Sequence, residues 1–154
     1  MAEKNEAENL PAAGIYIDSS ALAKLYVPEP ESERLDDFLR GRRDLVISDL
    51  SVTEVISAVA RRRREGVLDA EQASRIRSAV LSDAGSGSFQ RLDLSPVIHR
   101  EAERLLLSSE SVPLRTLDAL HIALAISGEA GSVLTFDGRM AEAAALHGLQ
   151  IVKV

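Results

Sequence analysis

Two aspartates stand where a buried strand is expected to run into a helix. Asp18 follows the β-branched and aromatic run 15–17, and Asp137 follows the predicted strand 132–136. Aspartate is a favoured helix N-cap, so capping alone explains either residue. The carboxyl ends of parallel strands share one edge of the sheet, where open α/β sheets bind ligands. If the two strands are neighbours, the carboxylates approach each other and need a cation or a shared proton.

A third acid, Asp118, lies at the start of a helix that is apolar on every face. Residues 117–126 read Leu-Asp-Ala-Leu-His-Ile-Ala-Leu-Ala-Ile, which predicts a central, mostly buried helix. An ionised carboxylate taken out of water costs several kcal/mol unless it is paired. The structural alternative is that the first helical turn favours an anion, with Thr116 as the cap. We favour a functional role for Asp118 because carboxylates are unusual at a buried helix start.

A fourth acid, Glu54, has the weakest support from the sequence pattern. The apolar stripe of its helix, which runs from Val52 to Val59, lies roughly opposite Glu54. The pattern alone therefore predicts a solvated surface glutamate. Leu50 and Ala58 share the side of Glu54, which leaves open that this side faces a cleft or a second subunit.

Composition limits the classes of function. The chain has 154 residues with 45% hydrophobic and 27% charged residues, an ordinary balance for one globular domain. It has no cysteine, which excludes disulfides and thiolate metal sites and fits a reducing cytoplasm. We expect no signal peptide and no membrane span, because no long apolar run is present. The net charge of −6 argues against a general nucleic-acid coat protein.

Basic residues and histidines give weaker signals. All but three of the 18 basic residues are arginine, whose planar side chain suits phosphate recognition. The run Arg61–Arg64 ends a helix, so a solvated helix end explains it, and phosphate contact is the alternative. The three histidines form no metal-ligand pattern. We expect His121, on the apolar helix, to be a hydrogen-bonded core residue.

Strands and helices alternate along the whole chain, with no β-hairpin signal. This order predicts one α/β domain over residues 14–154, a three-layer α/β/α sandwich around a parallel sheet of about five strands. Residues 1–13 are polar and acidic and are expected to form a flexible tail. A flexible loop is predicted at 84–88. The expected strands are 15–18, 45–48, 89–94, 132–136 and 150–154, and the expected helices are 19–27, 31–40, 50–64, 70–81, 95–108, 116–128 and 139–147.

Four stretches together resemble one known family. They are IYIDSSALAKLY from residue 15, SVTEV from residue 51, LRTLDALHIALA from residue 114, and VLTFDGRMAEAAALHGL from residue 133. In this order and at this spacing, they resemble the motifs of the PIN-domain ribonucleases, specifically the VapC-type toxins of bacterial toxin–antitoxin pairs. The resemblance covers nearly the whole chain from Gly14 to Val154.

This resemblance implies a metal-dependent endoribonuclease. It implies that Asp18, Glu54, Asp118 and Asp137 gather around one or two Mg²⁺ or Mn²⁺ ions, and that a water activated by the metal attacks an RNA phosphodiester bond. Further implied residues are the hydroxyls of Ser20 and Thr135 beside the acids, and Arg115 as a candidate RNA contact. The implied partners are an RNA substrate, a cognate antitoxin and a second copy of the chain in a homodimer.

Two alternatives to an enzyme remain at this point. A receiver-like signalling module would carry adjacent acids after its first strand and a lysine late in the chain. Here Asp18 stands alone, and the only late lysine is Lys153, on the last predicted strand. The other alternative is a PIN-like domain that only binds RNA or protein, which the four retained acids argue against.

Overall fold

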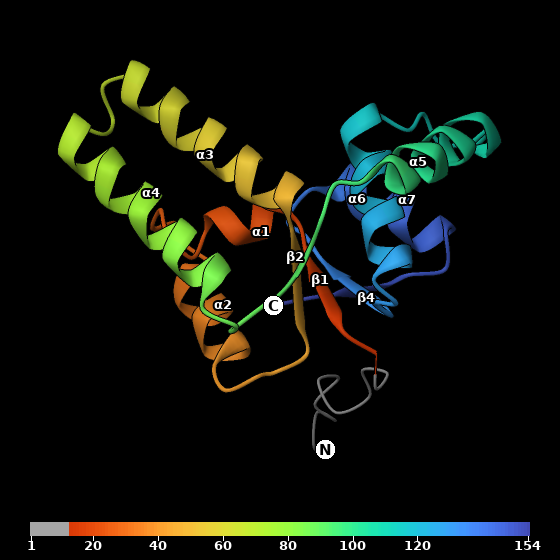
Figure 1. Cartoon of the computed structure of the whole chain (residues 1–154), viewed down its shortest axis with the longest axis horizontal. Coiled ribbons are helices and arrows are strands. Elements are labelled where there is room, and N and C mark those ends of the chain that lie inside the picture. The colour runs from red at the N-terminus through yellow and green to blue at the C-terminus, as the bar shows by residue number, and fades with distance from the viewer. Residues whose placement is uncertain (1–12) are drawn as a thin grey trace.

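Five parallel strands form the central sheet of this computed structural model, which describes residues 13–154 (Figure 1). The strand order is β3-β2-β1-β4-β5, which puts β1 at the centre. Each neighbouring pair is parallel, as predicted. The strands are β1 (Ile15–Ile17), β2 (Leu45–Ser48), β3 (Gln90–Leu92), β4 (Ser132–Leu134) and β5 (Gln150–Val152).

Helices cover both faces of the sheet, so the predicted three-layer α/β/α sandwich is confirmed. In Figure 1, α3 and α4 lie side by side as a long arm, and α5, α6 and α7 gather on the other side of the sheet. The helices within residues 13–154 are α1 (Ser19–Ala23), α2 (Ser32–Leu39), α3 (Asp49–Arg64), α4 (Ala70–Gly85), α5 (Pro96–Ser108), α6 (Thr116–Ser127) and α7 (Gly138–Leu146).

The side chains of the central strand β1 pack into two separate apolar cores, because successive side chains of a strand point to opposite faces of the sheet. Tyr16 packs into the core beneath α5, α6 and α7. Ile15 and Ile17 pack into the core beneath α1 to α4. All three side chains are fully buried. The alternation also directs Asp18, one residue past the strand, to the edge of the sheet on the Tyr16 side.

Strands β1 and β4 are direct neighbours, which the sequence alone left open. Ile17 pairs with Leu134, so the residues that follow each strand emerge side by side. The backbone N–H of Asp18 donates to the Leu134 carbonyl at 3.2 Å, extending the pairing past the end of β1. The receiver alternative is wrong, because the doubly wound order of receivers is 2-1-3-4-5 and would put the third strand beside the first.

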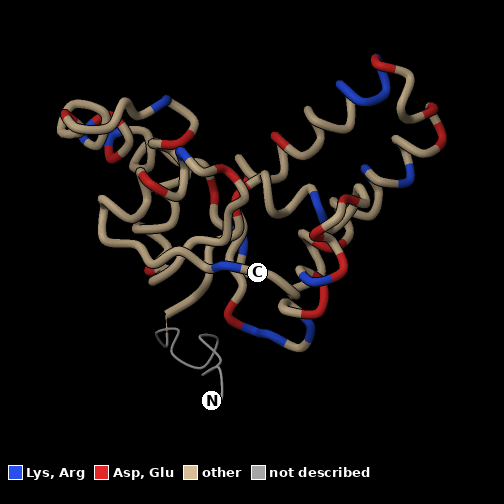
Figure 2. Tube along the Cα trace, turned by 180° about the vertical axis from the view of Figure 1, so that it is seen from behind, with Lys and Arg blue, Asp and Glu red and all other residues tan. Residues whose placement is uncertain are grey.

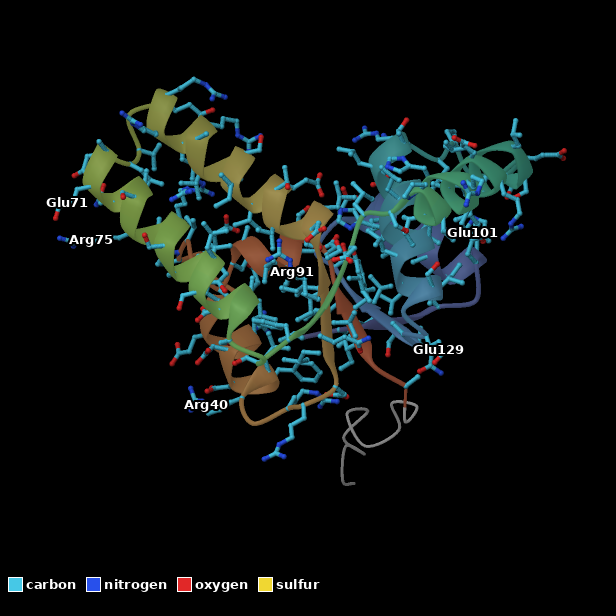
Figure 3. The ribbon with its side chains drawn as sticks, viewed as in Figure 1. Arg40, Glu71, Arg75, Arg91, Glu101 and Glu129 are labelled. Atoms are coloured by element: carbon cyan, nitrogen blue, oxygen red, sulfur yellow. The ribbon has the colours of Figure 1, made fainter. Side chains whose placement is uncertain are left out.

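The start of α3 is tied to the edge strand β3. Arg91 (labelled in Figure 3) donates from Nε to Asp49 Oδ1 at 2.7 Å. The other oxygen of Asp49 accepts from the Leu94 N–H at 3.3 Å. Ser48 caps the helix by accepting from the Ser51 N–H at 3.1 Å. These contacts fix the first turns of α3 against the carboxyl edge of the sheet.

Most of the strands and several helices are shorter or longer than predicted by one or two residues at an end, and the two largest differences are at the ends of α4 and α1. The predicted loop 84–88 begins later, because α4 continues to Gly85. Val80 and Ala84 are buried in the core beneath α1 to α4, and this packing extends the helix. Helix α1 ends at Ala23 instead of near residue 27, since the following N–H groups form tighter i→i−3 hydrogen bonds.

Residues 1–12, nearly all of the predicted tail, lie outside the described part of the chain. Within residues 13–154, none of the helices combines the length and apolarity that crossing a bilayer requires.

Leu105 and Leu107 on α5 provide a matched test of the core beneath α5, α6 and α7. Leu105 is 1% exposed and Leu107 is 87% exposed. We expect Leu105→Ala to lower the free energy of unfolding by about 2–5 kcal/mol, because it leaves a cavity. Leu107→Ala should change it by less than about 0.5 kcal/mol. Urea unfolding followed by circular dichroism measures both, and equal losses would contradict this packing.

Candidate functional site

The four predicted acids line one pocket of about 270 Å³ at the carboxyl edge of the sheet. They come from four places in the fold: the end of β1, helix α3, the first turn of α6, and the junction after β4. Met140 and Leu117 form apolar parts of the wall. The residues that line this acid pocket are Asp18, Ser19, Ser20, Glu54, Arg115, Thr116, Leu117, Asp118, His121, Asp137 and Met140.

Asp18 is buried and held in one orientation. Its Oδ1 accepts from the Ala21 N–H at 3.0 Å, the expected cap of α1, and from the Ser20 hydroxyl at 2.7 Å. Its Oδ2 accepts from the Thr135 hydroxyl at 2.5 Å. Ser20 also accepts from the Phe136 N–H at 2.8 Å. The hydroxyls of Ser20 and Thr135 therefore fix the orientation of the Asp18 carboxylate. They also link the residues that follow β1 to the residues that follow β4.

Asp137 caps α7 and faces the same pocket. Its Oδ1 accepts from the N–H groups of Arg139 and Met140 at 2.9 and 3.2 Å. Its own N–H donates to the Thr135 hydroxyl at 3.0 Å. Thr135 therefore contacts both strand-end aspartates. Asp137 caps α7 and also lines the acid pocket, so one role does not exclude the other.

Asp118 is the acid whose charge the protein compensates least. Burial raises the pKa of its carboxyl, and the nearby charge of Asp137 raises it further, against smaller opposing effects of His121 and two arginines. Among residues 13–154, no side chain donates a hydrogen bond to this carboxylate. The expectation that Thr116 caps α6 is wrong: Arg115 is the N-cap residue, and no side chain makes the cap hydrogen bond.

Glu54 is not the solvated residue that its helix pattern predicts. Its side chain is 25% exposed, and Oε2 lies 2.5 Å from Nε2 of His121. Burial raises the pKa of Glu54, but the hydrogen bond and charge of His121 outweigh it, and the pKa is lowered overall. The residue pattern of α3 alone does not predict this partner. The spacing of Asp118 and His121, three residues apart on α6, is the signal that puts both on one helix face.

The donor set fits a hard divalent cation. Within residues 13–154, no three acidic or histidine side chains converge as a ready-made ligand cage. Mg²⁺ does not require one, since it keeps several waters and binds through one or two carboxylates. Asp118 and Asp137 repel each other, and a cation between them would relieve that repulsion. The residues of the acid pocket therefore suit Mg²⁺ or Mn²⁺ and offer no thiolates for a softer metal.

A larger groove adjoins the acid pocket. It has a volume of about 550 Å³ and shares Ser19, Ser20, Glu54 and Leu117 with that pocket. Its basic lining residues are Lys24, Arg61 and Arg62. Lys24 and Arg62 both pair with Glu29. Figure 2 shows that the neighbouring α3–α4 arm carries both acidic and basic residues.

Comparison with known proteins gives a consistent assignment. The PIN domain family matches residues 15–146. This chain belongs to the PIN-domain family. Ribonuclease VapC46 of Mycobacterium tuberculosis is 37% identical over 144 residues, which cover 91% of this chain and 97% of that protein. The chain is therefore a PIN domain of the VapC type.

Solved structures share the fold of this VapC-type chain. VapC20 of Mycobacterium tuberculosis, described as a sarcin–ricin loop cleaving toxin, aligns with a TM-score of 0.73 and 15% identity over 92% of this chain and all of that one. A toxin–antitoxin complex from Klebsiella pneumoniae aligns with a TM-score of 0.62 and 18% identity, covering 92% of this chain and 97% of that one. At these identities the likeness supports the fold alone.

The repulsion at Asp118 predicts a pH-dependent stability. Folding raises the pKa of this carboxyl, so its ionised form destabilises the metal-free protein. The loss of stability is complete at a pH above the pKa in the folded state. It is absent at a pH below the pKa in the unfolded state. In EDTA at neutral pH, Asp118→Asn should melt at a higher temperature than the wild type. The gain should vanish as the pH falls toward about 4, the ordinary pKa of aspartate.

Thermal melts over this pH range, with the exposed Asp93→Asn as control, measure the effect. A variant that melts below the wild type in EDTA would contradict the repulsion.

Proposed function

We propose that this protein is a metal-dependent endoribonuclease and the toxin of a toxin–antitoxin pair. The observation that carries the proposal is that four carboxylates, from four separate elements, line one pocket beside a groove with basic side chains. Membership of the PIN-domain family and the VapC ribonuclease relatives support the same reaction.

Each side chain has a role that follows from its contacts. Asp18, Glu54, Asp118 and Asp137 would hold Mg²⁺ or Mn²⁺, with Asp18 prepositioned by Ser20 and Thr135. When bound, the metal supplies an activated water and stabilises negative charge at the phosphorus and the leaving oxygen. Fixing the carboxylates in advance lowers the cost of organising them in the transition state.

Two arginines at the acid pocket and the adjoining groove would contact the RNA backbone. Arg115 is exposed at the start of α6 and lines the acid pocket, where it would contact a phosphate next to the scissile one. Arg61 lies in the adjoining groove and could contact the backbone further along. With only 3% aromatic residues, recognition would rest on the phosphates and on loop contacts more than on base stacking.

Two protein partners complete the proposal. One is a cognate antitoxin, supported by the fold shared with the chain in the Klebsiella toxin–antitoxin complex. The other is a second copy of this chain in a homodimer, for which the exposed Val97, Leu107 and Leu146 on α5 and α7 offer apolar surface. An RNA substrate and an antitoxin partner would place the protein in the cytoplasm.

Asp118→Asn tests the reaction. The variant should lose RNA cleavage by at least about a hundredfold and should no longer inhibit growth on induction, because it removes one carboxylate of the metal site. Cleavage is measured by sequencing RNA ends after induced expression and with purified protein in Mn²⁺.

The control is Asp93→Asn, an exposed aspartate outside the acid pocket, which should cleave like the wild type. Circular dichroism shows that both variants fold. Undiminished cleavage by Asp118→Asn would refute the assignment of this acid, and a wild type that cleaves no RNA would refute the proposed reaction.

A further inference from the structure

A continuous buried chain of hydrogen bonds leads from the core of the sheet to the acid pocket. The phenol oxygen of Tyr16 lies 2.7 Å from Ser48 Oγ and 2.7 Å from Nδ1 of His121. Nε2 of His121 lies 2.5 Å from Oε2 of Glu54. Tyr16, Ser48 and Ser51 are fully buried, and His121 is 3% exposed. His121 and Glu54 both line the acid pocket, and Glu54, with 25% of its side chain exposed, is the more accessible of the two.

One set of donors satisfies every group in this chain. The Ser51 hydroxyl donates to the Ile17 carbonyl at 3.1 Å. The Ser48 hydroxyl can then donate to the phenol oxygen of Tyr16, and the Tyr16 O–H to Nδ1 of His121. In the neutral imidazole this leaves the proton of His121 on Nε2, where it donates to Glu54. In the protonated imidazole, whose charge lowers the pKa of Glu54, Nε2 still donates to Glu54 and Nδ1 donates to the Tyr16 oxygen. Both ring nitrogens are occupied, so His121 is not arranged as a metal ligand.

Core packing alone does not account for these residues. Buried polar groups cost free energy unless each is hydrogen-bonded, and apolar side chains of similar volume often stabilise such positions better. A tyrosine, a histidine and two serines in an otherwise aliphatic core are therefore an expensive way to fill space. The hydrogen bonds of these residues end at the carboxylate of Glu54. Their polar groups therefore fix the orientation of that carboxylate.

The His121–Glu54 contact also connects helices on opposite faces of the sheet. Glu54 belongs to α3 and His121 to α6, which lie in different layers of the sandwich (Figure 1). Asp118 lies three residues before His121 on the same face of α6. The contact thus joins the helix that carries Asp118 to the helix that carries Glu54, and sets the spacing of these two acids across the pocket.

We propose that His121, oriented by Tyr16, is a positioning residue that fixes the Glu54 carboxylate and the α3–α6 spacing for binding of the divalent cation. The inference rests on the proposed metal site but does not depend on which nucleic acid is cleaved. Hydrogen-bond partners that orient metal ligands typically contribute tenfold to hundredfold in metal affinity or activity, so an effect of about that size is expected.

Tyr16→Phe is the most selective variant, because it removes one oxygen and keeps the ring that packs in the core. We expect it to weaken Mn²⁺ binding, measured by isothermal titration calorimetry on the full chain, by about tenfold. His121→Leu should weaken it by about tenfold to a hundredfold, and His121→Gln, which keeps an N–H donor, should recover part of that loss. His99→Leu, at an exposed histidine on α5, is the matched control and should bind Mn²⁺ like the wild type.

A double-mutant cycle separates positioning from general destabilisation. If Tyr16 acts through Glu54, Tyr16→Phe should weaken Mn²⁺ binding in the wild type and have no further effect in the Glu54→Gln background. An equal loss in both backgrounds, or unchanged Mn²⁺ affinity in Tyr16→Phe, would overturn the proposal. Should His121→Leu fail to fold, the Tyr16→Phe cycle alone decides.

Calorimetry with Mn²⁺ alone distinguishes failure of this inference from failure of the proposed function. If the wild type binds Mn²⁺ but cleaves no RNA, the ribonuclease proposal fails while the cycle still tests His121. If the wild type cleaves RNA in Mn²⁺ and Tyr16→Phe needs no more Mn²⁺ for half-maximal rate, the positioning role fails while the ribonuclease proposal stands.

Discussion

The parallel pairing of β1 with β4 is the constraint on which the site depends. Because Ile17 and Leu134 are in register, Asp18 and Thr135 leave the sheet side by side. Their hydrogen bond then fixes the carboxylate of Asp18, and Thr135 also accepts from the Asp137 N–H. With any other strand beside β1, two of the four acids would leave the sheet apart, and the pocket would lack one wall.

The second determinant is electrostatic. Three acids of the pocket accept hydrogen bonds within the fold: Asp18 accepts three, Asp137 accepts two from backbone N–H groups, and Glu54 accepts one from His121. Asp118 is instead destabilised by burial and by Asp137. A fold that keeps this repulsion loses stability unless something positive offsets it. We take the uneven compensation as the physical argument for a cation at Asp118 and Asp137, with Asp18 and Glu54 as prepositioned neighbours.

Much of this arrangement could be predicted from local sequence. The β-branched runs and strand-end aspartates indicated a parallel sheet with acids at one edge, and the all-apolar helix singled out Asp118. Three features could not be predicted. The pairing of β1 with β4 is a tertiary choice, the end of α4 at Gly85 depends on burial of Ala84, and the contact of Glu54 with His121 joins residues 67 positions apart. Helical periodicity places Glu54 opposite the apolar stripe of α3. The contact with His121 on α6 makes that side of α3 a wall of the acid pocket.

Anomalous diffraction from crystals grown with Mn²⁺ would show whether the four acids form one divalent-cation site. If they do, a strong anomalous peak should lie within bonding distance, about 2.0–2.6 Å, of carboxylate oxygens of Asp118 and at least one of Asp18, Asp137 and Glu54. A fully occupied peak elsewhere, with no peak among these acids at saturating Mn²⁺, would contradict one shared site.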